Sequence, residues 1–424
     1  IYPILFLVFP RLWRVCHKRG YITAGDFVRG RFGNRWLALA IAATGIIATL
    51  PYIALQLVGI QVVLGGMGVG GSGLLADLPL IIAFVILAAF TYSSGLRAPA
   101  SIAVVKDVLI YFTAIVAVIV IPIQLGGFDK IFAAIPPAKL LLATPPAGST
   151  GSFSAYATLA LGSALALFLY PHSLTGILSA NSAGAIKRNA ALLPGYSFML
   201  GLLTLLGLFA IAAGVDKLPE FAPGFAVFKA SFAVPALFIH SFPSWFVGIA
   251  FAAIGIGALV PAAIMSIAAA NLYSRNIHRE FINPAATDRQ QSQVAKWVSL
   301  VVKIGALGFI VFLPQTYAIQ LQLLGGVWII QTLPAVLIGA YTRWFDDWAL
   351  FVGWAVGIVL GTWMAATTGF SSSTFTINLF GLAIPGYAAL YSLVINLVVA
   401  VVLTFVLKPM RKAQLDETAA VDYA

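Results

Sequence analysis

Long stretches of apolar residues follow one another along the chain, with short polar connections between them. A helix that spans a membrane needs about 20 mostly apolar residues. After a partial span at 1–13, full candidates lie at 36–66, 79–95, 108–126, 156–180, 191–214, 244–272, 297–313, 318–341, 348–367 and 384–407. Charged residues make up only 9% of the chain, against about 25% in soluble domains, so lipid must surround most of it. We therefore predict an all-α polytopic membrane protein with about ten full spans and one partial span.

The positive charges predict how the chain is oriented. Of the 24 Lys and Arg residues, 19 lie on one set of alternating connections, 4 lie on the opposite set, and Lys303 lies inside a predicted span. Because cytoplasmic connections carry an excess of Lys and Arg, we assign the first set, which includes the C-terminus, to the cytoplasmic side of a bacterial-type inner membrane. This pattern accounts for the net charge of +11 without a nucleic-acid partner. Lys303, inside the 297–313 span, is predicted to snorkel toward the cytoplasmic interface.

We read residues 1–424 as a single transmembrane domain. The chain opens within an apolar stretch, and we expect upstream helices to be missing. The segments 127–155 and 215–243 are predicted to be partly ordered lids with short surface helices. The tail at 408–424 is predicted to be cytoplasmic and mobile, and oligomeric state is left open.

The acidic residues exclude some coupling mechanisms. All 13 fall in loops, in the tail or at helix ends, so we expect no carboxylate at the midplane to relay protons. Neutral oxygens would have to hold a coupling cation, which favours sodium over a proton. The four histidines lack metal-ligand spacing, and no nucleophile–base pair is evident, so we expect neither an enzyme nor a cofactor other than the coupling ion.

The best candidate for a substrate site interrupts the 156–180 span. Pro171 has no amide hydrogen and breaks or kinks a helix, which frees carbonyls and exposes a positive helix N-terminus suited to an anion. Phe168, Tyr170 and His172 surround it in the sequence. The alternative is a plain proline kink in which His172 bonds to a neighbouring helix.

Other spans add polar candidates. Tyr52 and Gln56 share one helix face, and so do Trp328 and Gln331; each pair would serve either a ligand or contacts between helices. Ser266 offers a hydroxyl among small residues, although a lone serine in a helix more often bonds back to the carbonyl four residues earlier.

Several motifs resemble the sodium:solute symporter family, and within it the monocarboxylate-uptake permease branch. The matching stretches are the first polar loop at 20–33, the segment at 94–109, Tyr170-Pro171-His172, the helix at 262–266 and its continuation at 276–281. The likeness covers most of the chain from residue 1 to about residue 341.

This resemblance implies the leucine-transporter fold, in which two inverted five-helix repeats enclose the substrate. Residues 1–126 would be the remainder of repeat one, whose first helix would be absent, and 156–341 would be repeat two. Two appended helices would occupy 348–407. By position, the Ala263 carbonyl and the Ser266 hydroxyl resemble the family's sodium ligands, and Asp107 resembles the acid near the inward exit of the ion. Ile267 departs from the pattern, because many relatives carry a second hydroxyl there, and this leaves proton coupling open.

The resulting expectation is a symporter that imports a lactate-like or pyruvate-like monocarboxylate with a cation, with sodium favoured. Phe168, Tyr170 and His172 would form one wall of the site, Tyr52 and Gln56 another, and Trp328 a third, with Gln331 beside it. The alternatives are a proton-coupled carrier of another small solute and a solute-sensing input domain.

Overall fold

The computed structural model describes residues 2–69, 78–94, 97–312, 318–411 and 415–423. The first part of the chain forms α1 (Tyr2–Leu7), α2 (Phe9–Arg19), α3 (Ala24–Phe32), α4 (Arg35–Gly66), α5 (Leu78–Ser94), α6 (Arg97–Gln124), α7 (Phe128–Ala134) and α8 (Pro137–Leu140). Residues 95–96 of the predicted family motif at 94–109 lie outside the described residues.

The second part contains a broken helix, several long helices and a hairpin. Its elements are α9 (Gly151–Leu167), α10 (Pro171–Leu178), α11 (Ala183–Ala213), α12 (Ala222–Phe228), α13 (Ala233–Ser241), α14 (Ser244–Leu272), the π-helical η5 (Tyr273–Ile282), α15 (Asp288–Phe312), α16 (Ala318–Ile329), η6 (Ile330–Thr332), α17 (Leu333–Val336), η7 (Ile338–Ala340), α18 (Asp347–Ala366), β1 (Thr374–Leu379), β2 (Leu382–Tyr387) and α19 (Ala388–Leu407). Short 3-10 turns occupy η2 (Val215–Lys217), η3 (Pro219–Phe221), η4 (Lys229–Phe232), η8 (Lys408–Met410) and η9 (Ala420–Tyr423).

These elements confirm the predicted all-helical membrane fold. Within the described ranges, 9 helical stretches are long and apolar enough to span a membrane, or 10 if the bent α9–α10 pair forms one span. One of the 9, Pro219–Ser241, consists of short helices interrupted at Lys229, whose φ is 52°. The short helices predicted within 127–155 and 215–243 are present.

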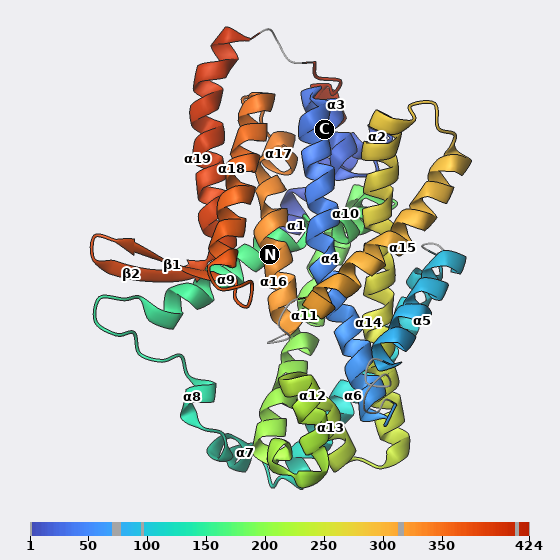
Figure 1. Ribbon diagram of the computed structural model, residues 1–424, viewed down its shortest axis with the longest axis vertical. Coiled ribbons are helices and arrows are strands. Elements are labelled where there is room, and N and C mark those ends of the chain that lie inside the picture. The colour runs from blue at the N-terminus through green and yellow to red at the C-terminus, as the bar shows by residue number, and fades with distance from the viewer. Residues whose placement is uncertain (1, 70–77, 95–96, 313–317, 412–414, 424) are drawn as a thin grey trace.

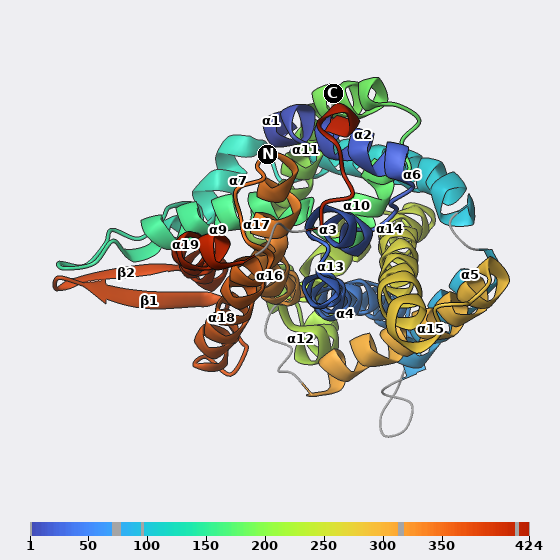
Figure 2. The same cartoon turned by 90° about the horizontal axis from the view of Figure 1, so that it is seen from above.

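The long helix α4 lies in the middle of the molecule (Figure 2). Seen from above, α5, α14 and α15 lie on one side of it, and α16, α18 and α19 lie on the other. In Figure 1, α3 and the C-terminus lie at one end of the long axis, whereas α7, α12 and α13 lie at the opposite end. We call the end that carries α3, η5 and the C-terminus the basic end.

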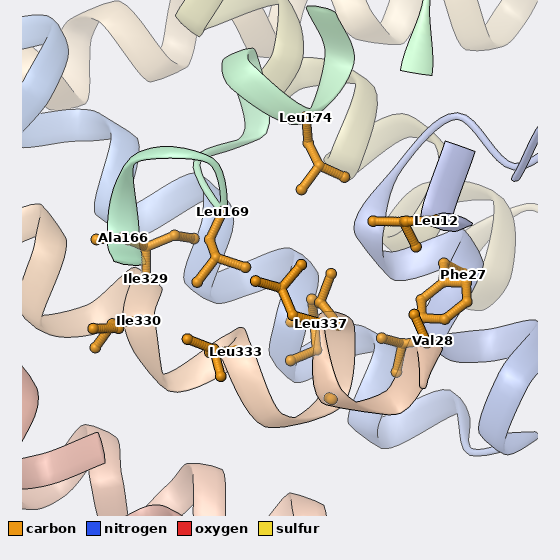
Figure 3. Close-up of a cluster of buried hydrophobic side chains, with 14 of the residues drawn as sticks. Leu12, Phe27, Val28, Ala166, Leu169, Leu174, Ile329, Ile330, Leu333 and Leu337 are labelled. Carbon is orange, nitrogen blue, oxygen red and sulfur yellow. The ribbon is translucent and has the colours of Figure 1, made fainter. Parts of the chain in front are cut away.

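The largest apolar core joins segments from both ends of the sequence (Figure 3). Leu12 of α2 and Phe27 of α3 lie in one cluster with Leu169 and Leu174, beside the break between α9 and α10. Leu333 of α17 completes this part of the cluster. The break is therefore supported by packed side chains on more than one side.

A β-hairpin replaces the start of the predicted 384–407 span. β1 and β2 pair antiparallel, with Phe380 (φ 50°) and Gly381 (φ 85°) in the turn. The amide of Thr150 donates to the Ala383 carbonyl, which ties the hairpin to the start of α9. The helical prediction for 384–387 is thus wrong, because these residues pair with β1 and α19 begins only at Ala388.

The tail was predicted to be mobile, but residues 415–423 pack against the basic end. Arg31 of α3 is 4% exposed at its side chain and pairs with Asp416 at 2.7 Å. Arg19 of α2 pairs with Asp422 at 2.6 Å. The amide of Ala419 and the Arg19 guanidinium both hold the pKa of Asp422 below its usual value, because they stabilise the charged carboxylate. Ion pairs therefore dock this part of the tail on α2 and α3.

Lys303 does not snorkel as predicted. Its side chain is part of the interior, with the residue 1% exposed, and its Nζ donates to Oγ and to the carbonyl of Ser299, at 2.8 and 3.2 Å. The face of α15 that carries Lys303 points inward, so the stem of the lysine cannot reach the interface.

Close packing at Gly325 yields a testable prediction. A Cβ at this position of α16 would lie 2.4 Å from the Ala48 carbonyl oxygen and 2.7 Å from the Tyr170 hydroxyl, whereas a Cβ at Gly207 of α11 would meet nothing within 4 Å. Gly325→Ala should lower the unfolding free energy by about 1–3 kcal/mol, because backbone must shift. Gly207→Ala should leave it unchanged or raise it by up to about 1 kcal/mol. Thermal unfolding in detergent measures both, and equal melting temperatures for the two variants would contradict the packing described.

Candidate functional site

The helix break predicted at Pro171 is present. α9 ends at Leu167, α10 begins at Pro171, and their axes differ by 47°. Pro171 occupies the first turn of α10, where its missing amide hydrogen is tolerated. Tyr170 precedes the helix with ψ 139° and offers no side-chain cap. The first amides of α10 therefore have no intrahelical partner and carry the positive end of the helix dipole.

Three rings meet at this break. The ring of Tyr52, from α4, lies 5.2 Å from that of Tyr170 and 5.4 Å from that of His172, measured between centroids. The Tyr170 and His172 rings are 5.6 Å apart. The Tyr170 hydroxyl donates to the Gln322 carbonyl of α16 at 3.0 Å. The structure therefore brings together three of the predicted site residues, from α4 and from the two sides of the break.

His172 has a buried nitrogen without a partner. Among the described residues, no group forms a hydrogen bond with its Nδ1, and the atom is shielded from solvent. Buried polar atoms are nearly always paired, and an exception calls for a missing partner such as a ligand or a water. The alternative in which His172 bonds to a neighbouring helix through Nδ1 is therefore not what the structure contains.

The backbone approaches closely beside the break. A Cβ on Gly45 of α4 would lie 2.7 Å from Leu272 of α14 and 3.0 Å from Pro171. The adjoining cavity has a volume of about 10 Å³, with Leu169 and Thr175 among its lining residues. This is about the space that one water occupies. The bundle is therefore closed around this part of the break.

Two other predicted residues flank the rings. Gln56 lies one turn from Tyr52 on the same face of α4 and is half-buried. Phe168 packs edge-on against Phe9 of α2, with 5.5 Å between the ring centroids. Phe168 thus contacts α2 directly.

Trp328 and Gln331 serve contacts between helices, which was the alternative considered for this pair. Trp328 Nε1 donates to the Thr362 hydroxyl of α18 at 3.0 Å. Gln331 Nε2 donates to the Ser392 hydroxyl of α19 at 2.8 Å, and Asn396 donates to the Gln331 side-chain oxygen at 3.1 Å. Their polar atoms bond to appended helices, so we leave both residues out of the proposed site.

The two predicted sodium ligands are adjacent on α14. Ala263 and Ser266 are both 0% exposed, and the Ser266 hydroxyl donates to the Ala263 carbonyl at 2.9 Å. This bond is also the local interaction that a serine makes when it has no ligand. The arrangement holds both oxygens within reach of one small cation.

Asp107 lies in a different environment from these ligands. Its carboxylate on α6 pairs with the neighbouring Lys106, and its side chain is 45% exposed. An exposed carboxylate suits a hydrated ion rather than a dehydrated binding site. This geometry fits the predicted position at an exit route better than a direct ligand.

A polar cluster at the basic end was not predicted as a unit. Asp26 of α3 accepts from Arg275 Nε at 2.9 Å and from Asn276 Nδ2 at 2.8 Å. Thr23 donates to the other side-chain atom of Asn276, Oδ1, at 2.8 Å. Thr23 and Asp26 belong to the family-like motif at 20–33, and Asn276 belongs to the one at 276–281. Only the fold shows that these two motifs are in contact. The cluster joins α3 to η5, which directly follows α14.

Comparison with known proteins shows which family the chain resembles. The model of the sodium:solute symporter family matches residues 1–357. A protein named monocarboxylate transport permease, from Rhizobium johnstonii, is 50% identical over 414 residues, which cover 96% of this chain and 80% of that protein. An uncharacterized symporter of Bacillus subtilis, YodF, is 31% identical over 85% of this chain and 70% of its own length.

A solved structure shares the fold. It is a Na⁺-coupled sialic acid symporter in a substrate-bound outward-open state, with a TM-score of 0.67 and 14% sequence identity. The match covers 97% of this chain and 86% of that one. The fold is therefore of the leucine-transporter type, as predicted.

The unpartnered His172 nitrogen generates a paired prediction. His172→Phe should leave the melting temperature in detergent unchanged or raise it, because no described hydrogen bond is lost at Nδ1. Tyr170→Phe should lower the unfolding free energy by about 1 kcal/mol, because the Gln322 carbonyl loses its donor. A larger loss for His172→Phe than for Tyr170→Phe would assign His172 to structure instead.

Proposed function

The chain belongs to the sodium:solute symporter family, and we propose that it imports a small monocarboxylate of the lactate or pyruvate type together with a sodium ion. The observation that carries the proposal is the helix break at Pro171, where the first amides of α10 have no intrahelical partner and the neighbouring His172 Nδ1 is buried without a described hydrogen-bond partner. In transporters, a discontinuous helix of this kind contributes to the binding site of the transported solute.

A monocarboxylate fits the chemistry of this break. The amides at the start of α10 can donate to a carboxylate, and the helix dipole favours a negative charge there. His172 Nδ1 and the Tyr52 hydroxyl can bond to the hydroxyl or keto oxygen beside the carboxylate. The ring faces enclose the short carbon chain, and Gln56 extends the polar wall. The 50% identity to a protein named monocarboxylate transport permease supports the same substrate class.

We expect a sodium ion to bind to the carbonyl oxygen of Ala263 and the hydroxyl oxygen of Ser266. Sodium is a hard cation that takes neutral oxygen ligands, and these two oxygens are 2.9 Å apart on one buried helix face. Ile267 supplies no further hydroxyl. This favours proton coupling as a second candidate, which the experiments below separate from the first.

We place the basic end on the cytoplasmic side of a bacterial inner membrane, because this end carries most of the Lys and Arg residues. Transport would proceed by alternating access between two inverted repeats, within 1–126 and 156–341, with 348–407 appended. The polar cluster around Asp26 would then form part of the cytoplasmic gate, since it joins α3 to η5.

Solute counterflow in proteoliposomes tests the substrate class without any ion gradient. Vesicles loaded with unlabelled L-lactate should accumulate external radiolabelled lactate, and pyruvate inside should serve as well. Lactamide, which lacks the charge, and succinate, which carries two, should not. Equal exchange with lactamide would remove the reason for a carboxylate site at the α10 N-terminus.

Ser266→Ala tests the cation site separately. This change removes one of two proposed ligands, so the sodium concentration for half-maximal counterflow should rise about 10-fold or more, by analogy with the loss of an ion ligand. Thermal stability should fall by no more than about 1 kcal/mol, because the lost bond lies within one helix. Ser274→Ala, which removes a similar local serine bond at the end of the same segment, is the control. An unchanged sodium requirement in Ser266→Ala would contradict the site.

A further inference from the structure

Lys303 is a buried cationic side chain that the proposed transport mechanism does not use. It lies near the middle of α15 and is 1% exposed, and its amine bonds to Ser299 Oγ at 2.8 Å and to the Ser299 carbonyl at 3.2 Å. Both acceptors are neutral. A lysine is rarely buried in this way unless an anion pairs with it or its proton has a function.

No carboxylate on the long helices that pack against α15 can neutralise the amine. The sequences of α4, α5 and α14 contain neither Asp nor Glu. Asp288, on α15 itself, lies 15 residues away, about 22 Å along the helix axis. Glu280 of η5 is engaged by Arg29 at 3.1 Å. Among the described elements that pack most closely against α15, a charge on Lys303 therefore meets neutral dipoles and no free carboxylate.

The remaining ionisable groups on these elements are few and lie mainly toward the basic end. They are Arg35 and Tyr52 of α4, Tyr92 of α5, Tyr273, Arg275, His278 and Arg279 of η5, and Arg289 and Lys296 of α15. Arg275 is paired with Asp26, and Lys296 lies over the Tyr92 ring at 5.4 Å.

A cavity connects the Lys303 region to the basic end. It has a volume of about 290 Å³ and is lined by α5, α14, η5 and α15, with Ser299 at one position and Arg275 and Asp288 at others. Thr91 and Asn271 add polar atoms to its wall. Because Ser299 both lines the cavity and accepts from Lys303, its hydroxyl connects the buried amine to a space large enough for water.

We infer that Lys303 binds and releases a proton during the transport cycle, through the Ser299 hydroxyl and this cavity. In the release step an N–H bond of the ammonium breaks and its proton passes to Ser299 Oγ. The Ser299 hydroxyl gives its own proton to a water in the cavity, which leaves a neutral amine, an intact serine and a hydronium ion. The reverse sequence recharges the amine.

The position of Lys303 connects this proton to the proposed sodium ion, and this step rests on the proposed function. α15 packs against α14, which carries Ala263 and Ser266. Ile267, next to Ser266, lines the same cavity as Ser299. Two positive charges across this apolar interface repel each other, so sodium binding expels the proton, and protonation weakens sodium binding by the same factor.

Proton release on sodium addition tests the inference without a substrate. The full-length protein, in detergent and weak buffer, is given NaCl or choline chloride, and a pH-sensitive dye reports protons. The wild type should release up to about one proton per protein with sodium only, and a lower pH should weaken its apparent sodium affinity about 5-fold or more. Lys303→Met should release none and lose the pH effect. Lys139→Met, which changes an exposed lysine of α8, is the matched control and should behave as wild type.

Further variants guard against a folding defect and test the route. Lys303→Arg keeps the charge at every pH, so it should release no proton and should bind sodium weakly throughout. Ser299→Ala should slow release without changing its final amount. Proton release that persists in a folded Lys303→Met protein, or is missing from the wild type, overturns the inference. Lactate counterflow is measured in a separate experiment. If lactate proves not to be a substrate, the proton-release measurement can therefore still be interpreted.

Discussion

The structure depends on one constraint: in a hydrocarbon environment, backbone amides and carbonyls must find partners within the protein. The long helices satisfy this condition along their length, and α4 runs through the centre of the molecule with helices on either side (Figure 2). The interruption between α9 and α10 departs from it. Buried residues such as Leu169 and Leu174 shield this interruption from lipid (Figure 3), which is the condition under which irregular backbone is tolerated at membrane depth.

The break between α9 and α10 both holds neighbouring helices together and leaves polar groups available to a solute. Tyr170 anchors the break to α16 through the Gln322 carbonyl, whereas the neighbouring His172 leaves a nitrogen without a described partner. Packing thus fixes the position of the break, and the unsatisfied groups remain for a solute. Gly45 and Gly325 allow α4 to approach both sides of it, since a side chain at either position would clash.

Hydropathy alone predicts most of the membrane spans, because such spans are long and their composition is distinctive. Their arrangement as a leucine-transporter fold is implied only by the family resemblance. Pro171 stands out because a histidine and two hydroxyl residues follow it, not because it is a proline, since prolines such as Pro51 and Pro261 lie inside helices that continue past them. The roles of single side chains are harder to predict, because they depend on which face of a helix points toward the interior. Tyr52 and Trp328 look equivalent in the sequence, yet one faces the break and the other faces α18. Lys303 could snorkel to the membrane interface only if its face of α15 were exposed, and the residue is 1% exposed. The hairpin was missed because the alternation in 374–387 is masked by apolar residues on both faces, although Phe380-Gly381 is a recognisable turn.

In the mechanism proposed above, the protein binds a monocarboxylate at the α9–α10 break and carries it together with sodium. The most direct test is uptake of radiolabelled lactate by the full-length protein in proteoliposomes, with an inward sodium gradient and an inward proton gradient imposed in separate experiments. We expect the sodium gradient alone to drive lactate inside the proteoliposomes above its equilibrium distribution. Accumulation that requires the proton gradient and ignores sodium, or no accumulation under either gradient, would contradict it.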